Sequence, residues 1–214
     1  MIVAIAGIDG AGKSSLTRAL RDWLLSEGVD CTLIDKWDIF DAERFPEYRF
    51  VDGDRLALCD CIVQMNGFSR SLFLFWLVTA CMPKDERSYE NRVLLLDGYW
   101  MKHAAAEQLA GCDPEWLLQT AAQMPPCDLV ILLDVDPRIT VERKGDDLLP
   151  YECGVVSGGT PQEFVRHQQE VSRLLREWGR ARGWETISAE VAPERVLERA
   201  KDIVGAHLRR CGLS

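Results

Sequence analysis

The sequence opens with IVAIAGIDGAGKS at residues 2–14, and this stretch decides the fold. Residues 2–6 are apolar and partly β-branched, which predicts a buried strand. The stretch continues from Gly7 to Ser14 with the pattern G-x-x-x-x-G-K-S. Apolar residues then recur at helical spacing: Leu16, Leu20, Trp23 and Leu24. A strand before this pattern and a helix after it are the context in which it indicates a phosphate-binding loop rather than a glycine-rich turn without a ligand.

Each part of the loop suits the binding of a polyphosphate. Its glycines let backbone N–H groups turn toward the phosphates, Lys13 adds a positive charge near the β- and γ-phosphates, and the Ser14 hydroxyl can ligate Mg²⁺. The helix that begins at the loop turns its positive dipole end toward the same anion. We therefore expect ATP and Mg²⁺ as cofactors. The loop residues expected to bind the nucleotide are Gly7, Asp9, Gly10, Ala11, Gly12, Lys13, Ser14 and Ser15.

The composition limits the class of protein and of partner. The 214 residues allow one α/β domain with a substantial core, or one domain with an inserted lid. Apolar residues make up 47% and charged residues 28%, as in an ordinary soluble globular protein. The net charge of −9 argues against a nucleic acid polymer or an acidic membrane as partner. The longest apolar stretch, Leu72 to Met82, is too short to span a bilayer.

The cysteines do not form a recognisable framework. There are 8 of them, with no C-x-x-C pair, and the 3 histidines do not complete a zinc pattern. The strand expected at residue 2 leaves no room for a signal peptide. We therefore expect reduced cysteines in a cytoplasmic protein.

Strands and helices alternate along the rest of the chain. Further strands are predicted at 31–35, 92–97, 128–135 and 186–188, and helices at 53–82 with a break near Gly67, 100–110, 114–123, 136–143, from 160 to about 178, and 193–208. This alternation predicts a three-layer α/β fold with a doubly wound parallel sheet. Residues 1–214 are expected to form a single domain. The glycine-rich segment at about 144–160 is predicted to be a small lid.

Carboxylates follow several predicted strands, where parallel sheets bind their ligands. They are Asp35, Asp97, Asp134 and Asp136. Asp97 is the best candidate for holding Mg²⁺ together with Ser14, because it ends an apolar strand near the phosphate loop; a helix cap or turn residue is the alternative. Asp9 lies inside the loop, where it would repel ATP unless it points toward an acceptor. It would then bind or deprotonate the acceptor hydroxyl, or otherwise cap the following helix.

Cations near the predicted lid are candidates for stabilising a transferred phosphoryl group. Arg143, Lys144 and Arg138 lie just before or within that segment. When a lid closes and expels water, such side chains can contact the phosphates. For Arg138 and Lys144, an ordinary surface position is the favoured alternative.

These pieces together resemble the thymidylate kinase family of nucleoside monophosphate kinases. The resemblance rests on GIDGAGKSS at 7–15, on DLVILLDVDP at 128–137 with Glu142-Arg143-Lys144, and on the closing strand and helix from Ile187 to Val196. It implies a P-loop kinase fold and phosphoryl transfer from ATP with Mg²⁺. It also implies that Lys13 and Ser14 serve ATP and the metal, that Asp9 contacts the acceptor sugar, and that Arg143 lies near the nucleotide. Lys13, Asp9, Asp97 and Arg143 are thus the predicted catalytic residues.

The departures from the family fall on the acceptor side. Lys36-Trp37-Asp38-Ile39-Phe40 stands where the family has Glu-Pro-Gly-Gly, and Asp97-Gly98-Tyr99 stands where it has Asp-Arg-Tyr. A further acceptor-phosphate arginine has no equivalent near residues 77–82. Replacements for these arginines could come from Arg49, Arg55 or Arg70. The acceptor therefore stays open among a nucleotide, a nucleoside and another small alcohol, and aromatic residues such as Trp37, Phe40, Tyr48, Phe68 and Phe75 are candidates for stacking on a base.

Two other functions compete with a small-molecule kinase. A GTPase-type switch requires the motif N-K-x-D, which is absent, and a D-x-x-G after the third strand, where Asp97 is followed instead by Gly-Tyr-Trp. A catalytically weak ATP-binding protein with an assembly role is consistent with the missing arginines. A homodimer through the apolar helix at 70–82 is possible, although that face could equally be internal.

Overall fold

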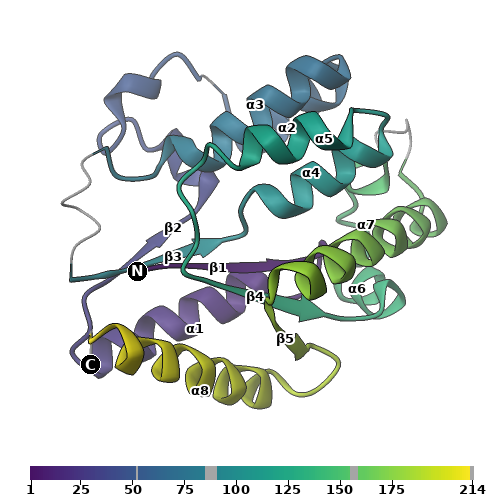
Figure 1. Ribbon diagram of the computed structural model, residues 1–214. Helices are drawn as coiled ribbons and strands as arrows, with labels where there is room; N and C mark the ends of the chain where they lie inside the picture. Colours follow the sequence, from purple (N-terminus) through teal and green to yellow (C-terminus); the bar gives the residue numbers. More distant parts are fainter. Residues whose placement is uncertain (52, 85–90, 155–158, 213–214) are drawn as a thin grey trace.

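The computed structural model describes residues 1–51, 53–84, 91–154 and 159–212 (Figure 1). Its strands are β1 Ile2–Gly7, β2 Cys31–Ile34, β3 Val93–Asp97, β4 Leu129–Asp134 and β5 Glu185–Ser188. Its helices are α1 Lys13–Ser26, α2 Arg55–Gln64, α3 Gly67–Ala80, α4 Trp100–Leu109, α5 Pro114–Ala121, α6 Pro137–Lys144, α7 Pro161–Arg182 and α8 Pro193–Cys211. Short 3₁₀ helices lie at Lys36–Phe40, Pro46–Tyr48 and Pro150–Cys153.

The five strands form one parallel sheet in the order β2-β3-β1-β4-β5. Every residue of β1 is buried, and Val3, Ala4 and Ile5 are fully enclosed. A strand that is buried on both faces has a continuous run of apolar residues, which explains the IVAIAG sequence. Each fully buried Ile or Val side chain stabilises the fold by about 1.5–3 kcal/mol. The strongest apolar run of the sequence therefore lies at the centre of the sheet.

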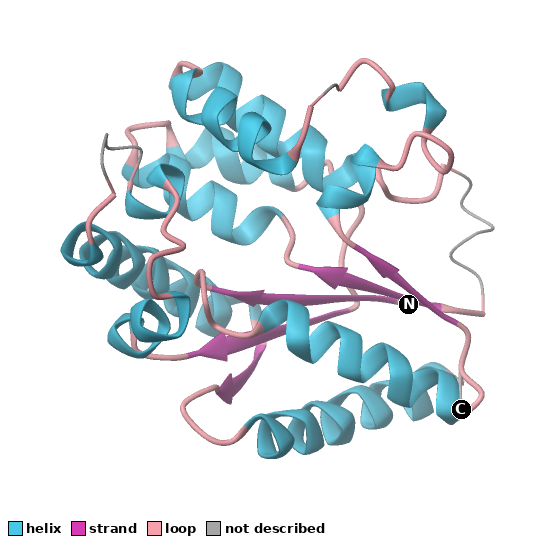
Figure 2. Cartoon of the chain, turned by 180° about the vertical axis from the view of Figure 1, so that it is seen from behind, coloured by secondary structure: helices cyan, strands magenta, loops and turns pink. Residues whose placement is uncertain are grey.

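Helices cover both faces of this sheet. α1 and α8 pack together on one face, whereas α4 and α7 lie on the other (Figure 1). The view from behind shows the strands enclosed between these two helical layers (Figure 2). The predicted three-layer, doubly wound parallel fold is confirmed.

Local capping explains where the helices begin. The long apolar segment at 53–82 is divided into α2 and α3, because Met65 is extended and the Asn66 side chain caps α3 by accepting a bond from the Ser69 amide. Thr160 and Glu163 form the predicted capping box of α7. The break near Gly67 and the start of the helix at 160 are thus confirmed.

The predicted lid at about 144–160 falls partly within the described chain. It contains the 3₁₀ helix Pro150–Cys153, which packs against α7. Residues 155–158 lie outside the described residues. The lid and the single domain over 1–214 stay predictions.

The strand order places a ligand site beyond β1. The chain leaves β1 to build β2 and β3 on one side, and later builds β4 and β5 on the other. In such sheets a crevice opens at the carboxyl ends of the strands, at the point where the strand order reverses. The residues that follow β1 are those of the glycine-rich loop.

Candidate active site

The loop between β1 and α1 has a backbone that requires glycine. Gly10 has φ +77° and Gly12 has φ +94°, a region that residues with a side chain rarely adopt. A Cβ added at Gly10 would lie 2.9 Å from Thr140 Cβ, because α6 packs directly on the loop. Gly12 is the N-cap of α1 and offers no side chain to the first-turn amides. Those N–H groups are therefore available to an anion.

Lys13 curls back over this loop. Its Nζ donates a hydrogen bond of 2.7 Å to the Ile8 carbonyl oxygen. Burial lowers the pKa of Lys13, and the Asp9 carboxylate partly offsets that effect. The ammonium is thus held against the backbone of the loop that it follows.

A cavity of about 440 Å³ extends from the loop across the carboxyl ends of the strands. Its lining includes the predicted residues Gly7, Asp9, Gly10, Gly12, Lys13, Ser14, Ser15, Asp97 and Arg143. It also includes residues that were not predicted as site residues, among them Lys36, Lys102, His103 and Glu152. The fold therefore brings the loop together with side chains from β3, α4, α6 and the 3₁₀ helix at 36–40.

Asp97 lies at the end of β3, next to the loop. Parallel pairing sets it opposite Ile5 of β1, two residues before the loop begins. Asp97 and Ser14 both line the cavity. Within the described residues, no group of three His, Cys, Asp or Glu side chains is arranged to hold a metal. A carboxylate and a hydroxyl still suit Mg²⁺, which usually takes one or two protein oxygens and completes its shell with phosphates and water.

Asp9 forms a buried ion pair that the sequence did not predict. Its Oδ1 accepts a hydrogen bond of 2.7 Å from Lys102 Nζ, and the two side chains are only 14% and 15% exposed. Its Oδ2 accepts a bond of 3.2 Å from Gln168 Nε2. Burial raises the pKa of Asp9, but the positive charges of Lys102 and Lys13 together lower it more. The pKa of this carboxyl group therefore lies far below its usual value, and Asp9 is ionised. Asp9 thus links the loop to α4 and α7.

The other strand-end acids differ in their surroundings. Asp35 lines the cavity and accepts a bond of 3.0 Å from the Trp37 amide, and burial raises its pKa. Asp134 pairs with Arg176 at 2.7 Å. Asp136 caps α6 and pairs with Arg138. Asp134 and Asp136 thus have partners within the fold.

Arg143 and Lys144, two of the cations near the predicted lid, have different partners. Arg143 donates a bond of 2.9 Å to the Ala189 carbonyl oxygen. It lines both the 440 Å³ cavity and a second cavity of about 580 Å³. Lys144 pairs with Glu152 at 3.1 Å. Among the described residues, Arg143 is therefore the cation that lines both cavities.

The second cavity is mostly apolar and lies on the other side of the loop. Its lining includes Ala11, Leu16, Ala19, Val191, Pro193 and Leu197. A flat apolar group attached to phosphates in the loop would fit such a cavity.

A small recess of about 60 Å³ has charged and apolar walls, and its charged residues are Asp9, Lys36, Arg55, Lys102 and Glu152. Cys59, Ile62, Leu74, Leu77 and Leu149 line it, together with Trp37 and His103. Burial lowers the pKa of His103 well below its usual value, so its ring is neutral. Among the aromatic residues predicted to stack on a base, Trp37 lines both this recess and the large cavity. Phe68 stacks on Trp116 and is 60% exposed, whereas Tyr48 packs against Trp76.

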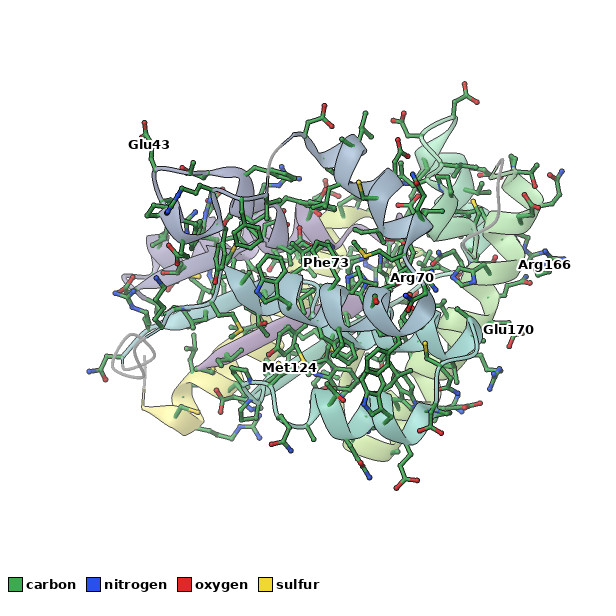
Figure 3. All side chains as sticks on the ribbon, turned by 90° about the horizontal axis from the view of Figure 1, so that it is seen from above. Glu43, Arg70, Phe73, Met124, Arg166 and Glu170 are labelled. Carbon is green, nitrogen blue, oxygen red and sulfur yellow. The ribbon has the colours of Figure 1, made fainter. Side chains whose placement is uncertain are left out.

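The three arginines proposed for the acceptor side lie in different places. Arg55 lines both spaces and stacks over Trp37 at 4.9 Å. Arg49 bonds the Pro46 carbonyl oxygen. Arg70 is buried and pairs with Glu107 at 2.8 Å, in the helical layer above the sheet (Figure 3). In the same view, Glu43, Arg166 and Glu170 point outward at the edge of the molecule. Arg55 is thus the arginine of the three that reaches the site.

The chain is similar to several thymidylate kinases. It is 30% identical over 148 residues to a probable thymidylate kinase of Staphylothermus marinus, covering 66% of this chain and 67% of the relative. The chain belongs to the thymidylate kinase family. A probable thymidylate kinase 1 of Saccharolobus solfataricus is 23% identical over 209 residues, covering 97% of this chain and 98% of the relative. A thymidylate kinase of Xylella fastidiosa is 28% identical over 158 residues, covering 67% of this chain and 65% of the relative.

Membership of the thymidylate kinase family agrees with the fold and the loop, and it makes the protein a P-loop nucleotide kinase. A non-nucleotide acceptor and a pure assembly role are not favoured. No protein-family model matches the chain. Among the described residues, no helix combines the length and the apolar character needed to cross a bilayer.

Proposed function

We propose that this protein uses ATP and Mg²⁺ to phosphorylate a nucleoside monophosphate. The observation that carries the proposal is the single 440 Å³ cavity, which joins the phosphate loop to a space lined by Lys36, Lys102 and Trp37. One end suits the phosphates of a donor and the other suits a charged, aromatic acceptor. Thymidylate, which the relatives' names specify, is the first acceptor to test.

The loop and its neighbours support a particular placement of ATP. The first-turn amides of α1 and the Lys13 ammonium would bind the β- and γ-phosphates. The apolar 580 Å³ cavity beside Arg143 would take the adenine. Ser14 and Asp97 would hold Mg²⁺, which neutralises charge on the phosphates during transfer.

The reaction requires an acceptor oxygen to approach the γ-phosphorus. A phosphate oxygen of the nucleoside monophosphate forms the new bond, the bond from the γ-phosphorus to its bridging oxygen breaks, and ADP leaves. Catalysis of this kind depends on position and on stabilised charge. Lys13 and Arg143, which both line the cavity, would stabilise the charge on the transferred group.

The test is a panel of nucleoside monophosphates, nucleosides and unrelated alcohols with ATP labelled in the γ-phosphate, read by which product carries the label. We expect label in a nucleoside diphosphate. Lys13→Ala should lower kcat about 10²–10³-fold, since one removed donor to developing charge typically costs that much. Lys201→Ala is the matched control, because Lys201 lies on α8 and pairs with Glu198. Label in no monophosphate, or full activity of Lys13→Ala, would overturn the proposal.

A further inference from the structure

We propose that Lys36 and Lys102 bind the phosphate of the acceptor nucleotide, with Asp9 holding Lys102 in position. This inference rests on the proposed function and assigns residues to its acceptor side. The two lysines would take the place of the arginines that the sequence lacks there. Lys36 follows β2, Lys102 lies in the first turn of α4, and both line the cavity that begins at the phosphate loop.

Lys36 is a half-buried cation that forms no ion pair within the described residues. In the described part of the chain, its ammonium forms no hydrogen bond and no ion pair, and it lies over the Trp37 ring, 5.1 Å from the ring centre. Burial and the neighbouring charge of Lys102 lower its pKa to about 8. Asp35 and Asp9 favour the charged form, whereas Lys13 opposes it. A half-buried ammonium without an ion pair has lost part of its hydration, and an anion placed beside it offsets that loss.

Lys102 is fixed in an orientation that leaves donors free. One of its three N–H groups bonds Asp9, so two remain for a ligand. Lys102 also lies near the amino end of α4, where the helix dipole disfavours a cation. Asp9 compensates for this, and Gln168 holds Asp9 from the opposite side. The ion pair therefore explains why a lysine is stable at this position.

Three of the four described carboxylates that line the cavity are already engaged. Asp9 pairs with Lys102, Glu152 pairs with Lys144, and Asp35 caps the 3₁₀ helix that contains Lys36. Asp97, at the end of β3, lines the same cavity as Ser14. Among the described residues, the ammonium of Lys36 pairs with none of these carboxylates and is therefore open to an anion from outside the chain.

A phosphate dianion matches this arrangement better than a neutral group does. Two ammonium groups can share its charge, and Arg55 stands nearby as a third cation. Phosphoryl transfer between two nucleotides also brings two anionic groups close together, which requires cations between them. Lysines on the acceptor side, facing Lys13 on the donor side, meet this requirement. A nucleoside without phosphate would leave Lys36 unpaired.

Binding measurements on the full chain test the inference. Thymidine monophosphate and thymidine would be titrated by calorimetry into wild-type protein, Lys36→Met and Lys102→Met. We expect each variant to bind the monophosphate about 10–100-fold more weakly, the usual range for one hydrogen bond to a charged group. Thymidine should bind all three proteins equally, and the Kd of MgATP should be unchanged. Lys36→Arg and Lys102→Arg should retain most of the monophosphate affinity, and Lys201→Met is the remote control.

The role of Asp9 requires a coupling measurement. Asp9→Asn should weaken monophosphate binding in the wild-type background but have little further effect in Lys102→Met. Equal effects in both backgrounds would overturn the positioning role.

The two proposals fail in different ways. If the wild-type protein labels a monophosphate and both methionine variants bind it normally, the lysine site is wrong and the kinase function stands. If the wild-type protein labels no monophosphate, both proposals fall. Circular dichroism and thermal unfolding would show that each variant is folded.

Discussion

Replacement of two loop glycines by alanine should have unequal effects on stability. Gly10→Ala and Gly12→Ala both force a side chain into a positive-φ conformation, at φ +77° and +94°. That strain costs about 1–2 kcal/mol in each case. The surroundings differ, because a Cβ at Gly12 meets nothing within 4 Å. A Cβ at Gly10 would lie 2.9 Å from Thr140 Cβ and 3.0 Å from the Thr140 carbonyl oxygen.

The additional cost at Gly10 comes from backbone that cannot simply rotate away. Thr140 is fully buried in α6, and its hydroxyl bonds the Pro137 carbonyl oxygen. Overpacking of this kind typically costs about 1–3 kcal/mol. We therefore expect Gly10→Ala to lower the free energy of unfolding by about 1–3 kcal/mol more than Gly12→Ala does.

Urea unfolding without nucleotide, followed by circular dichroism, measures this difference. With an m value of about 2 kcal/mol/M, the midpoint of Gly10→Ala should lie about 0.5–1.5 M below that of Gly12→Ala. Equal midpoints with unchanged m values would refute the close packing of α6 on the loop. A lower midpoint for Gly12→Ala would refute the account of both positions.

Further predictions concern the charges of the site and of the core. Because Lys36 has a pKa of about 8, monophosphate affinity should fall as pH rises above 8, up to about 10-fold per unit. The phosphate itself has a second pKa of about 6 and is fully charged above pH 8. Lys36→Arg should abolish the decrease in affinity above pH 8. A decrease that persists in this variant would assign the titration to another group. Arg70→Met should destabilise the fold by about 3–5 kcal/mol in urea unfolding, since it leaves Glu107 buried without its partner; a loss below about 1 kcal/mol would contradict this. Asp97→Asn should raise the Mg²⁺ concentration for half-maximal activity about 10-fold or more, and an unchanged titration would remove Asp97 from the metal site.

Much of the fold could be predicted because short segments of the sequence each indicate where a strand, a turn or a helix begins. The apolar run of β1 and the loop glycines define a strand, a turn and a helix start within 14 residues. Asp113 with Pro114, and Thr160 with Glu163, mark helix starts through their own side chains. The 3₁₀ helix Lys36–Phe40 was harder to predict, because its stability depends on the Asp35 cap and on packing against α3 rather than on any periodicity.

The residues proposed to bind the donor could be named from the sequence, whereas the lysines proposed for the acceptor could not. Lys102 meets Asp9 across 93 residues of sequence, and no local pattern connects them. A usable signal was present nonetheless: a lysine in the first turn of a helix opposes the helix dipole and therefore requires a nearby acid. Arg70 shows a different problem. An arginine on an apolar helix can form an ion pair in the core or bind a ligand, and the sequence alone does not distinguish the two. Its pairing with Glu107 became visible only in three dimensions.

The lowered pKa of Lys36 also makes its amine a target for selective chemical modification. At neutral pH, ordinary lysines are almost entirely protonated and react slowly with acylating or aldehyde reagents. With a pKa of about 8, roughly a fifth of the Lys36 side chains carry a free amine at pH 7.4. Peptide mass spectrometry after brief labelling should find Lys36 modified before the exposed Lys84, with protection by an added monophosphate. A covalent inhibitor directed at this amine would occupy the acceptor space without competing for the nucleotide loop.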